Sequence, residues 1–230
     1  MIISHQNKFI FIRIPKTAST SVEVAFSAIC GPKDIISGVS FHNDRENAIE
    51  GYEGEKNLAS LRIHPLTHLL RKLTGQPEID YKHASAKIIK DSLPSAQWNS
   101  YFKFCFVRNP FDRAVSLYYW RMKNWEKKHD QERPSVSDYI LSLAPEKLST
   151  WQRYTIHGKV AVDHVARFEN LQGEIDAICQ RLGLAPILLP QTKSNIRKDR
   201  SPYQELLNSA ARSKIESACE KEMTEFGYNW

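Results

Sequence analysis

The chain has 230 residues, which is enough for one sizeable α/β domain with its own hydrophobic core. Its apolar share of 41% and charged share of 25% are those of a soluble globular protein, and no apolar run reaches the roughly 18 residues of a transmembrane helix. The formal net charge of +6 favours an anionic ligand or substrate, but it does not separate a nucleotide from a glycan or a nucleic acid.

Residues 1–8 lack the basic-then-apolar order of a secretory signal. We therefore expect a cytoplasmic protein without a membrane partner, unless an anchor was removed from the chain. The cysteines are widely spaced, form no CxxC pair and are expected to be buried thiols; they are Cys30, Cys105, Cys179 and Cys219. None of the usual metal-ligand spacings is recognisable, so we expect no metal site.

Residues 9–30 predict a strand, a loop and a helix in succession. A β-branched and aromatic run breaks at Pro15, passes through Lys16 and four hydroxyl residues, and resumes with helical spacing from Val22. A loop entering a helix N-terminus presents unpaired backbone N–H groups and the positive end of the helix dipole, so it favours an anion. An ordinary polar turn is the alternative, because the Gly-Lys-Ser/Thr ending of a Walker A loop is absent.

Residues 31–80 are the least regular part of the chain and carry many charges. The segment is too long for a plain connection, so we expect a functional insertion with short helices, one of them at residues 66–73. Loops on a rigid scaffold usually determine substrate specificity, so this segment is the candidate for recognition of the acceptor substrate. We thus expect one domain over residues 1–230 with residues 31–80 as its acceptor-binding insertion.

Two regular elements follow the insertion. Residues 83–93 predict a short helix, with His83 at or just before its first turn and Pro94 at its end. Residues 101–107 give the strongest strand signal in the chain. They are nearly all apolar apart from Lys103, which is typical of a central strand covered on both faces.

The rest of the chain alternates helices with short strands. The predicted elements are a turn over 108–113 that leads into a helix through 114–122, a polar interruption over 123–137, a helix from 137, one or two strands within 160–168, a helix after 169–171 that ends at Gly183, a basic loop over 190–200, and a last helix starting in a capping box at 201–204. No internal repeat or low-complexity tract is present.

A second anion site is predicted after the strongest strand. Arg108 stands at the end of this strand, and Ser116 lies eight residues further on. An arginine fork suits a phosphate, and a serine hydroxyl can complete the clamp. In an open parallel sheet ligands bind beyond the carboxyl ends of the strands, so we expect Lys16 and Arg108 to project toward one crevice. The sequence therefore predicts two phosphate sites side by side.

Both motifs resemble those of the sulfotransferase family, in particular of its branch that modifies carbohydrates. The 5′-phosphosulfate loop of that family is similar to Pro15-Lys16-Thr17-Ala18-Ser19-Thr20-Ser21, and its 3′-phosphate motif is similar to residues 108–116. Further similarity lies at 165–171 and 226–228, so the resemblance spans residues 9–30 and 81–230. The basic loop departs from the family at Lys193-Ser194-Asn195, and Arg197 is its candidate nucleotide contact.

The resemblance implies 3′-phosphoadenosine 5′-phosphosulfate (PAPS) as co-substrate, adenosine 3′,5′-bisphosphate (PAP) as product, and sulfuryl transfer to a hydroxyl or amine. Lys16 would neutralise the charge that develops on the leaving bridging oxygen, while residues 17–21 would hold the 5′-phosphate. The implied fold is a three-layer α/β/α arrangement with a central parallel sheet, like that of P-loop nucleotide-binding proteins. A metal is less necessary, because a sulfuryl group carries less negative charge than a phosphoryl group.

The expected acceptor base is His83. A neutral imidazole can accept a hydroxyl proton near pH 7, and a helix N-terminus disfavours the imidazolium form. Related carbohydrate sulfotransferases are similar in placing a histidine shortly before this strand. A capping or surface histidine is the alternative interpretation. His64 and His68 are alternative candidates four residues apart, but Pro65 lies between them. Glu23, just inside the first helix, is another candidate base.

The sequence favours a sulfotransferase that acts on a hydroxylated acceptor, a small molecule or a glycan, with a saccharide as the favoured class and no nucleic-acid partner. Two other classes stay open. One is a P-loop kinase or NTPase, against which the missing Gly-Lys-Ser/Thr ending argues. The other is a non-catalytic nucleotide-binding protein that has lost its acceptor base. Neither the identity of the acceptor nor the oligomeric state follows from the sequence.

Overall fold

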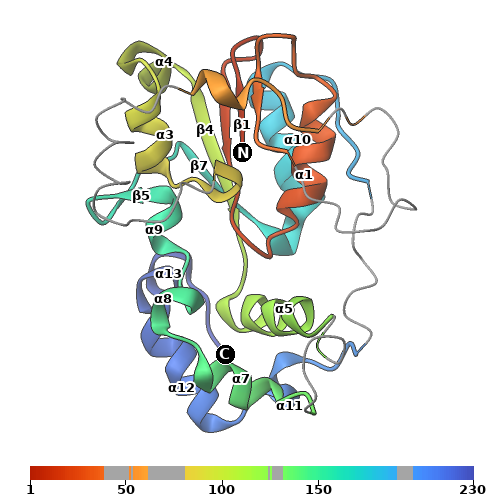
Figure 1. Cartoon of the computed structure of the whole chain (residues 1–230), viewed down its shortest axis with the longest axis vertical. Helices are drawn as coiled ribbons and strands as arrows, with labels where there is room; N and C mark the ends of the chain where they lie inside the picture. Colours follow the sequence, from red (N-terminus) through yellow and green to blue (C-terminus); the bar gives the residue numbers. More distant parts are fainter. Residues whose placement is uncertain (39–51, 53, 62–80, 124, 126–131, 191–198) are drawn as a thin grey trace. The chain divides into compact units, whose positions relative to one another are not determined.

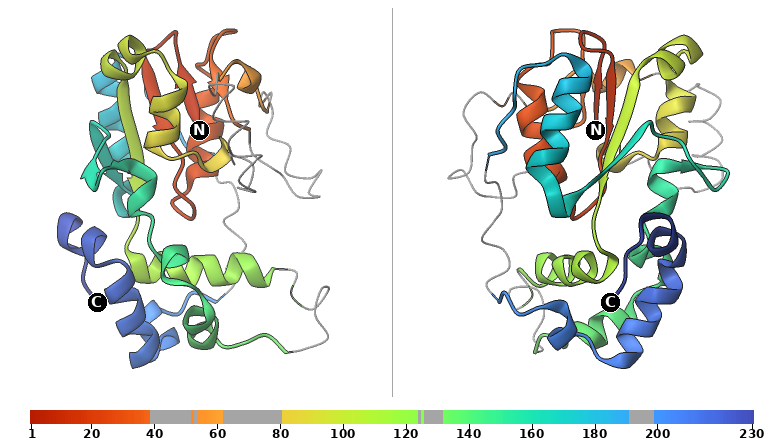
Figure 2. Two further views of the ribbon diagram at one scale, coloured as in Figure 1. Left: turned by 60° about the vertical axis from the view of Figure 1, so that its left-hand side comes forward. Right: turned by 180° about the vertical axis from the view of Figure 1, so that it is seen from behind.

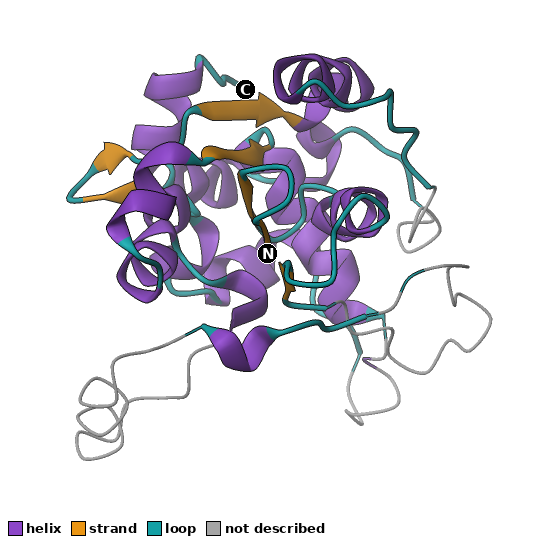
Figure 3. Ribbon diagram, turned by 90° about the horizontal axis from the view of Figure 1, so that it is seen from above, coloured by secondary structure: helices purple, strands orange, loops and turns teal. Residues whose placement is uncertain are grey.

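The computed structural model describes the chain except for residues 39–51, 53, 62–80, 124, 126–131 and 191–198 (Figure 1). It forms two compact units. The first comprises Met1–Val107 and Gln152–Thr192, and the second comprises Arg108–Trp151 and Lys193–Trp230. The prediction of a single domain with an acceptor-binding insertion is not decided by this division and stays a prediction. Helices make up more of the described chain than strands do (Figure 3).

The first unit contains a five-stranded sheet in the order β3-β1-β2-β4-β7. Its strands are β1 (Ile2–Ser4), β2 (Phe9–Ile12), β3 (Ile35–Ile36), β4 (Phe102–Val107) and β7 (His164–Arg167). The strands β2, β4 and β7 are parallel, with Ile12 opposite Cys105 and Cys105 opposite Val165. The chain therefore leaves β2 and β4 at the same edge of the sheet, as the predicted site requires. A separate two-stranded sheet pairs β5 (Thr155–Ile156) with β6 (Lys159–Val160).

The prediction of a purely parallel sheet is wrong, because the sheet is mixed. Strand β1 runs antiparallel to β2, with Ser4 opposite Phe9, and β3 runs antiparallel to β1, with Ile2 opposite Ile36. The turn between β1 and β2 is short and includes Lys8 at a φ of 53°. Such a hairpin adds an antiparallel edge to an otherwise parallel sheet, which is common among α/β proteins.

Helices cover both faces of this sheet (Figures 1 and 2). One face carries α1 (Ser19–Ser27) and α10 (Leu171–Leu182), and the other carries α3 (Ala86–Ser92) and α4 (Ser95–Ser100). The core between the sheet and the first pair is rich in fully buried phenylalanines: Phe9, Phe11, Phe26, Phe104 and Phe106. Gly183 ends α10 at a φ of 67°, as predicted. Short 3₁₀ turns η2 (Leu58–Ser60), η3 (Tyr81–His83) and η4 (Phe168–Asn170), together with α9 (Trp151–Tyr154), complete the regular structure around the sheet.

Lys103, the one polar residue predicted inside the strongest strand, is 7% exposed in β4. Its ammonium group donates to the carbonyl oxygens of Tyr101, at 2.7 Å, and Trp98, at 3.1 Å. It also lies 2.9 Å from a carboxylate oxygen of Asp163. A buried charge is tolerated only when it is paired and hydrogen-bonded, and these contacts satisfy that condition. The strand is therefore central, as its apolar pattern predicted.

The second unit is helical and consists of α5 (Pro110–Met122), α7 (Val136–Ser142), α8 (Pro145–Leu148), α11 (Tyr203–Leu206), α12 (Ser209–Ala218) and α13 (Glu220–Phe226). Its core gathers apolar residues of α5, α7 and α12, such as Val115, Ile140 and Ile215. The prediction of one long last helix capped at 201–204 is wrong. A short helix, α11, begins in the predicted place at Tyr203 but ends at Leu206, and the side chain of Asn208 then accepts from the N–H of Ala211 and caps the separate helix α12.

Cys105, Cys179 and Cys219 are buried free thiols, as predicted, whereas Cys30 is half-buried. Burial raises the pKa of the Cys30 and Cys219 thiols to about 12, so both stay protonated at neutral pH. Within the described residues, no helix combines the length and the apolar content needed to cross a membrane. Among the same residues, no three His, Cys, Asp or Glu side chains are grouped so that they could hold a metal ion.

Candidate functional site

The loop between β2 and α1 has the backbone geometry of an anion site. Lys16 and Ala18 adopt left-handed conformations with φ of 69° and 56°, while Thr17 between them does not. Left-handed φ is uncommon outside glycine, so the fold holds this backbone against a local cost. An alternation of right- and left-handed residues turns successive N–H groups toward one point and makes a concave nest for an anion. The left-handed conformations of Lys16 and Ala18 are compatible with such a nest, and anion binding by this loop stays a prediction.

The start of α1 adds to this nest. The N-cap position is held by Ala18, which has no side-chain oxygen, so no side chain caps the first turn. That turn also contains no acidic residue. The first N–H groups of a helix need an acceptor, and a bound anion can supply it together with a favourable interaction with the helix dipole. A phosphate group would therefore complete this helix.

The side chains of the loop differ in accessibility. The hydroxyl of Thr17 is fully buried and donates to the carbonyl oxygen of Ile14 at 2.9 Å, so it folds the loop back on itself. Ser19 and Ser21 are buried, while Lys16 and Thr20 are half-buried. Pro15 starts the turn and is also half-buried. Residues 15–18 therefore form the turn, which the Thr17 hydrogen bond stabilises, and Ser19, Thr20 and Ser21 form the first turn of α1.

Glu23, the alternative base, is a structural residue. Its carboxylate is completely buried and accepts hydrogen bonds from Ser37, at 3.3 Å, and Tyr52, at 3.1 Å. It also lies 3.2 Å from the guanidinium of Arg13 and 2.6 Å from the amino group of Met1. Burial alone would raise the pKa of Glu23, but the two positive charges and the hydrogen bonds outweigh it and lower that pKa. A carboxylate held ionised and out of reach of solvent is not placed to take a proton from a substrate.

His83 ends the 3₁₀ turn η3 and lies two residues before Ser85, the N-cap of α3. The predicted helix thus starts at Ala86, and His83 stands just before it. The ring is half-buried, and its Nδ1 atom is buried. A guanidinium nitrogen of Arg153, which precedes β5, donates to the carbonyl oxygen of His83 at 2.5 Å. Since Nδ1 is inaccessible, Nε2 is the nitrogen that a substrate hydroxyl could approach.

Arg108 directly follows β4 and begins the second unit. Its Nε and Nη2 atoms lie 2.8 and 2.6 Å from one carboxylate oxygen, Oδ2 of Asp112, in the first turn of α5. Asn109 caps that helix, because its side chain accepts from the N–H of Phe111 at 3.0 Å. Ser116 is half-buried on the same helix, four residues after Asp112. Residues four apart share a helix face, so the structure brings Asp112 and Ser116 together with Arg108.

The remaining predicted residues have different outcomes. Arg197, His64, His68 and the predicted helix at 66–73 lie outside the described residues. That Lys16 and Arg108 face one crevice stays a prediction, because the two residues belong to different units. Sequence reasoning overlooked Asp112, although opposite charges four residues apart are a readable signal. It also overlooked Arg153, for which no local pattern exists.

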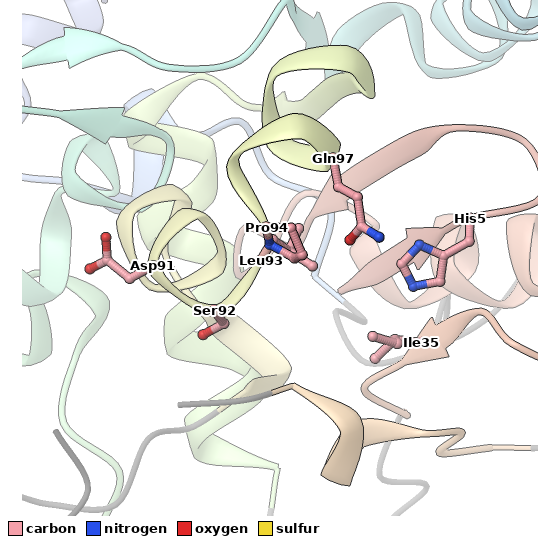
Figure 4. A pocket seen from close by; sticks show the side chains of 7 residues that line it. All are labelled: His5, Ile35, Asp91, Ser92, Leu93, Pro94 and Gln97. Atoms are coloured by element: carbon pink, nitrogen blue, oxygen red, sulfur yellow. The ribbon is translucent and has the colours of Figure 1, made fainter. Parts of the chain in front are cut away.

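A pocket of the first unit (the hollow) lies away from the loop that follows β2 (Figure 4). It has a volume of about 470 Å³ and is lined by His5, Ile35, Asp91, Ser92, Leu93, Pro94 and Gln97. His5 follows β1 and contacts the hydroxyl of Tyr101 through Nδ1 at 2.9 Å. The end of β1 lies beside the start of β2, at the sheet edge opposite the loop that follows β2. None of the predicted site residues that the structure describes lines this hollow.

Comparison with known proteins gives one extended match. A family model described as "Sulfotransferase family" matches residues 1–229, which is nearly the whole chain. An uncharacterized protein of Archaeoglobus fulgidus is 30% identical over 102 residues, which cover 43% of this chain and 82% of that protein. No solved structure matches the chain significantly.

Proposed function

The chain belongs to the sulfotransferase family, and from this premise we propose that it transfers a sulfuryl group from PAPS to a hydroxyl of an acceptor, with a carbohydrate as the favoured class. One observation supports PAPS as the donor. Helix α1 begins without a side-chain cap, directly after a loop in which Lys16 and Ala18 are left-handed. A nucleotide 5′-phosphosulfate would be a favourable acceptor for the N–H groups at the start of this helix. The finer fold assignment, a P-loop-like sulfotransferase fold, rests on the same β2-loop-α1 unit beside the parallel strands β4 and β7.

The proposed reaction is an in-line displacement at sulfur. The acceptor oxygen forms a bond to sulfur while the bond between sulfur and the bridging phosphate oxygen breaks. His83 takes the acceptor proton at Nε2, and Lys16 neutralises the negative charge that appears on the bridging oxygen. The products are the sulfated acceptor and PAP. In this scheme Arg108 and Ser116 bind the 3′-phosphate, and Arg197 is a further nucleotide contact.

Transfer from labelled PAPS tests the proposal directly. Incubation with panels of glycans, phenols and small alcohols is expected to label at least one hydroxylated acceptor without added metal ions, and mass spectrometry would locate the new sulfate. A parallel incubation with ATP and magnesium examines the kinase or NTPase alternative. Turnover of ATP with no transfer from PAPS would contradict the proposal. Binding of PAP without transfer to any acceptor would instead favour a non-catalytic nucleotide-binding protein.

The 3′-phosphate assignment predicts that Arg108→Ala weakens binding of PAP by about ten- to a hundredfold, as expected for losing charge-assisted hydrogen bonds to a phosphate. Affinity for adenosine 5′-phosphate, which lacks the 3′-phosphate, is expected to change by less than about threefold. Isothermal titration calorimetry with both nucleotides measures the two affinities. An unchanged affinity for PAP would remove Arg108 from the nucleotide site.

A further inference from the structure

The ion pair of Arg108 and Asp112 fixes the plane of the guanidinium group. A single oxygen of Asp112 accepts from both Nε, at 2.8 Å, and Nη2, at 2.6 Å. Both side chains are largely shielded from solvent, with exposed fractions of 13% for Arg108 and 27% for Asp112. An arginine side chain has many rotamers, and two contacts to one acceptor select among them. Asp112 therefore contacts the edge of the guanidinium group that Nε and Nη2 form. The third nitrogen, Nη1, is not part of that edge.

We propose that Asp112 is a positioning residue that holds the Arg108 guanidinium ready for the 3′-phosphate of the nucleotide. This inference rests on the proposed function, in which Arg108 binds that phosphate. Ser116 lies on the same face of α5 as Asp112, about one turn further along the helix. A ligand that meets an already ordered arginine does not have to order it, and this preorganisation increases affinity.

The negative charge of Asp112 acts in the opposite direction, because it repels a phosphate. A phosphate bound at another edge of the guanidinium would have that group between itself and Asp112, and the carboxylate is 27% exposed, so solvent would screen part of this repulsion. Ordering of Arg108 is therefore expected to outweigh repulsion. Removal of the Asp112 carboxylate separates the two contributions. Weaker binding of PAP would show that ordering of Arg108 dominates, and tighter binding would show that repulsion dominates.

The chain contains a matched control for this pair. In α12 of the same unit, Arg212 and Glu216 are also four residues apart, and Nε of Arg212 lies 2.8 Å from a carboxylate oxygen. This pair is more exposed, with fractions of 42% and 36%, and no phosphate contact is assigned to Arg212. Removing Glu216 thus breaks an equivalent helical ion pair without touching the proposed site.

The test is calorimetric titration of the full chain with PAP and with adenosine 5′-phosphate. The unsubstituted protein is expected to prefer PAP. Asp112→Ala is expected to lose about tenfold in affinity for PAP, which corresponds to the cost of ordering one arginine side chain, with little change for adenosine 5′-phosphate. Asp112→Asn keeps an oxygen acceptor of the same shape and is expected to lose less. Glu216→Ala is expected to bind both nucleotides normally.

The outcomes separate this inference from the proposed function. If the unsubstituted protein binds both nucleotides equally, the assignment of Arg108 fails, and the inference fails with it. If it prefers PAP, and Asp112→Ala and Asp112→Asn keep that preference in full or increase it, only the role of Asp112 is overturned. An equal loss for both nucleotides would show a merely structural role for Asp112 and would also overturn the inference. Thermal unfolding of each variant confirms that a folded protein is being titrated.

Discussion

Replacing His83 by alanine is expected to reduce the rate of sulfuryl transfer by about a hundred- to ten-thousandfold, the usual contribution of a positioned general base. Affinity for PAP is expected to stay within about threefold, because a base that contacts the acceptor does not bind the nucleotide. Single-turnover measurement with labelled PAPS gives the rate, and calorimetry gives the affinity. Added imidazole is expected to restore part of the rate by occupying the space of the missing ring.

His5 provides the control for this substitution. It is a half-buried histidine of the same unit, at the turn between β1 and β2, and its Nδ1 lies 2.9 Å from the hydroxyl of Tyr101. His5→Ala is expected to transfer at the normal rate, since this residue lies at the sheet edge away from the loop after β2. Full turnover by His83→Ala would remove His83 as the base. Unaltered behaviour of both variants would then turn attention to the residues outside the described ranges, His64 and His68 included.

Several elements could be read from the sequence because their signals are local. The apolar run of β4 predicted a central strand, and the break at Pro15 followed by helical spacing predicted the loop before α1. Helix α5 runs through Ala114 and ends at Met122, as predicted, but it already begins at Pro110, inside the predicted turn. In each case the residues that decide the structure are neighbours in the chain. The lysine and hydroxyl residues of this loop also predicted an anion site, which stays a prediction.

The antiparallel part of the sheet could not be read in the same way. Strands of two or three residues show no periodicity, and the pairing of Ile2 with Ile36 depends on contacts between distant parts of the chain. Among the candidate site residues, the sequence predicted Arg108 and His83 but not the contacts that surround each of them. The burial of Nδ1 in His83 and the contact from Arg153 arise from tertiary packing. Such contacts decide which atom of a predicted residue can react, and no local pattern encodes them.

Lys16→Ala is expected to slow sulfuryl transfer by about a hundred- to a thousandfold, because it removes a preorganised charge from the leaving oxygen. Lys8→Ala is a matched control. Lys8 is another lysine at a left-handed φ, 53° against 69° for Lys16, and it lies in the turn between β1 and β2. Both substitutions therefore remove one positive charge from a similar backbone conformation. Only the first is expected to affect the reaction.

The same charge argument predicts how strongly Lys16→Ala affects binding of PAPS, binding of PAP and the rate of transfer. In PAPS the bridging oxygen is bonded to sulfur, whereas in PAP it belongs to a free phosphate group and carries more negative charge. Loss of Lys16 is therefore expected to weaken binding of PAPS least and binding of PAP more, with the largest effect on the rate of transfer. Titration with each nucleotide and single-turnover kinetics measure the three quantities. Equal losses in rate and in affinity for PAPS would make Lys16 a binding residue with no preference for the transition state.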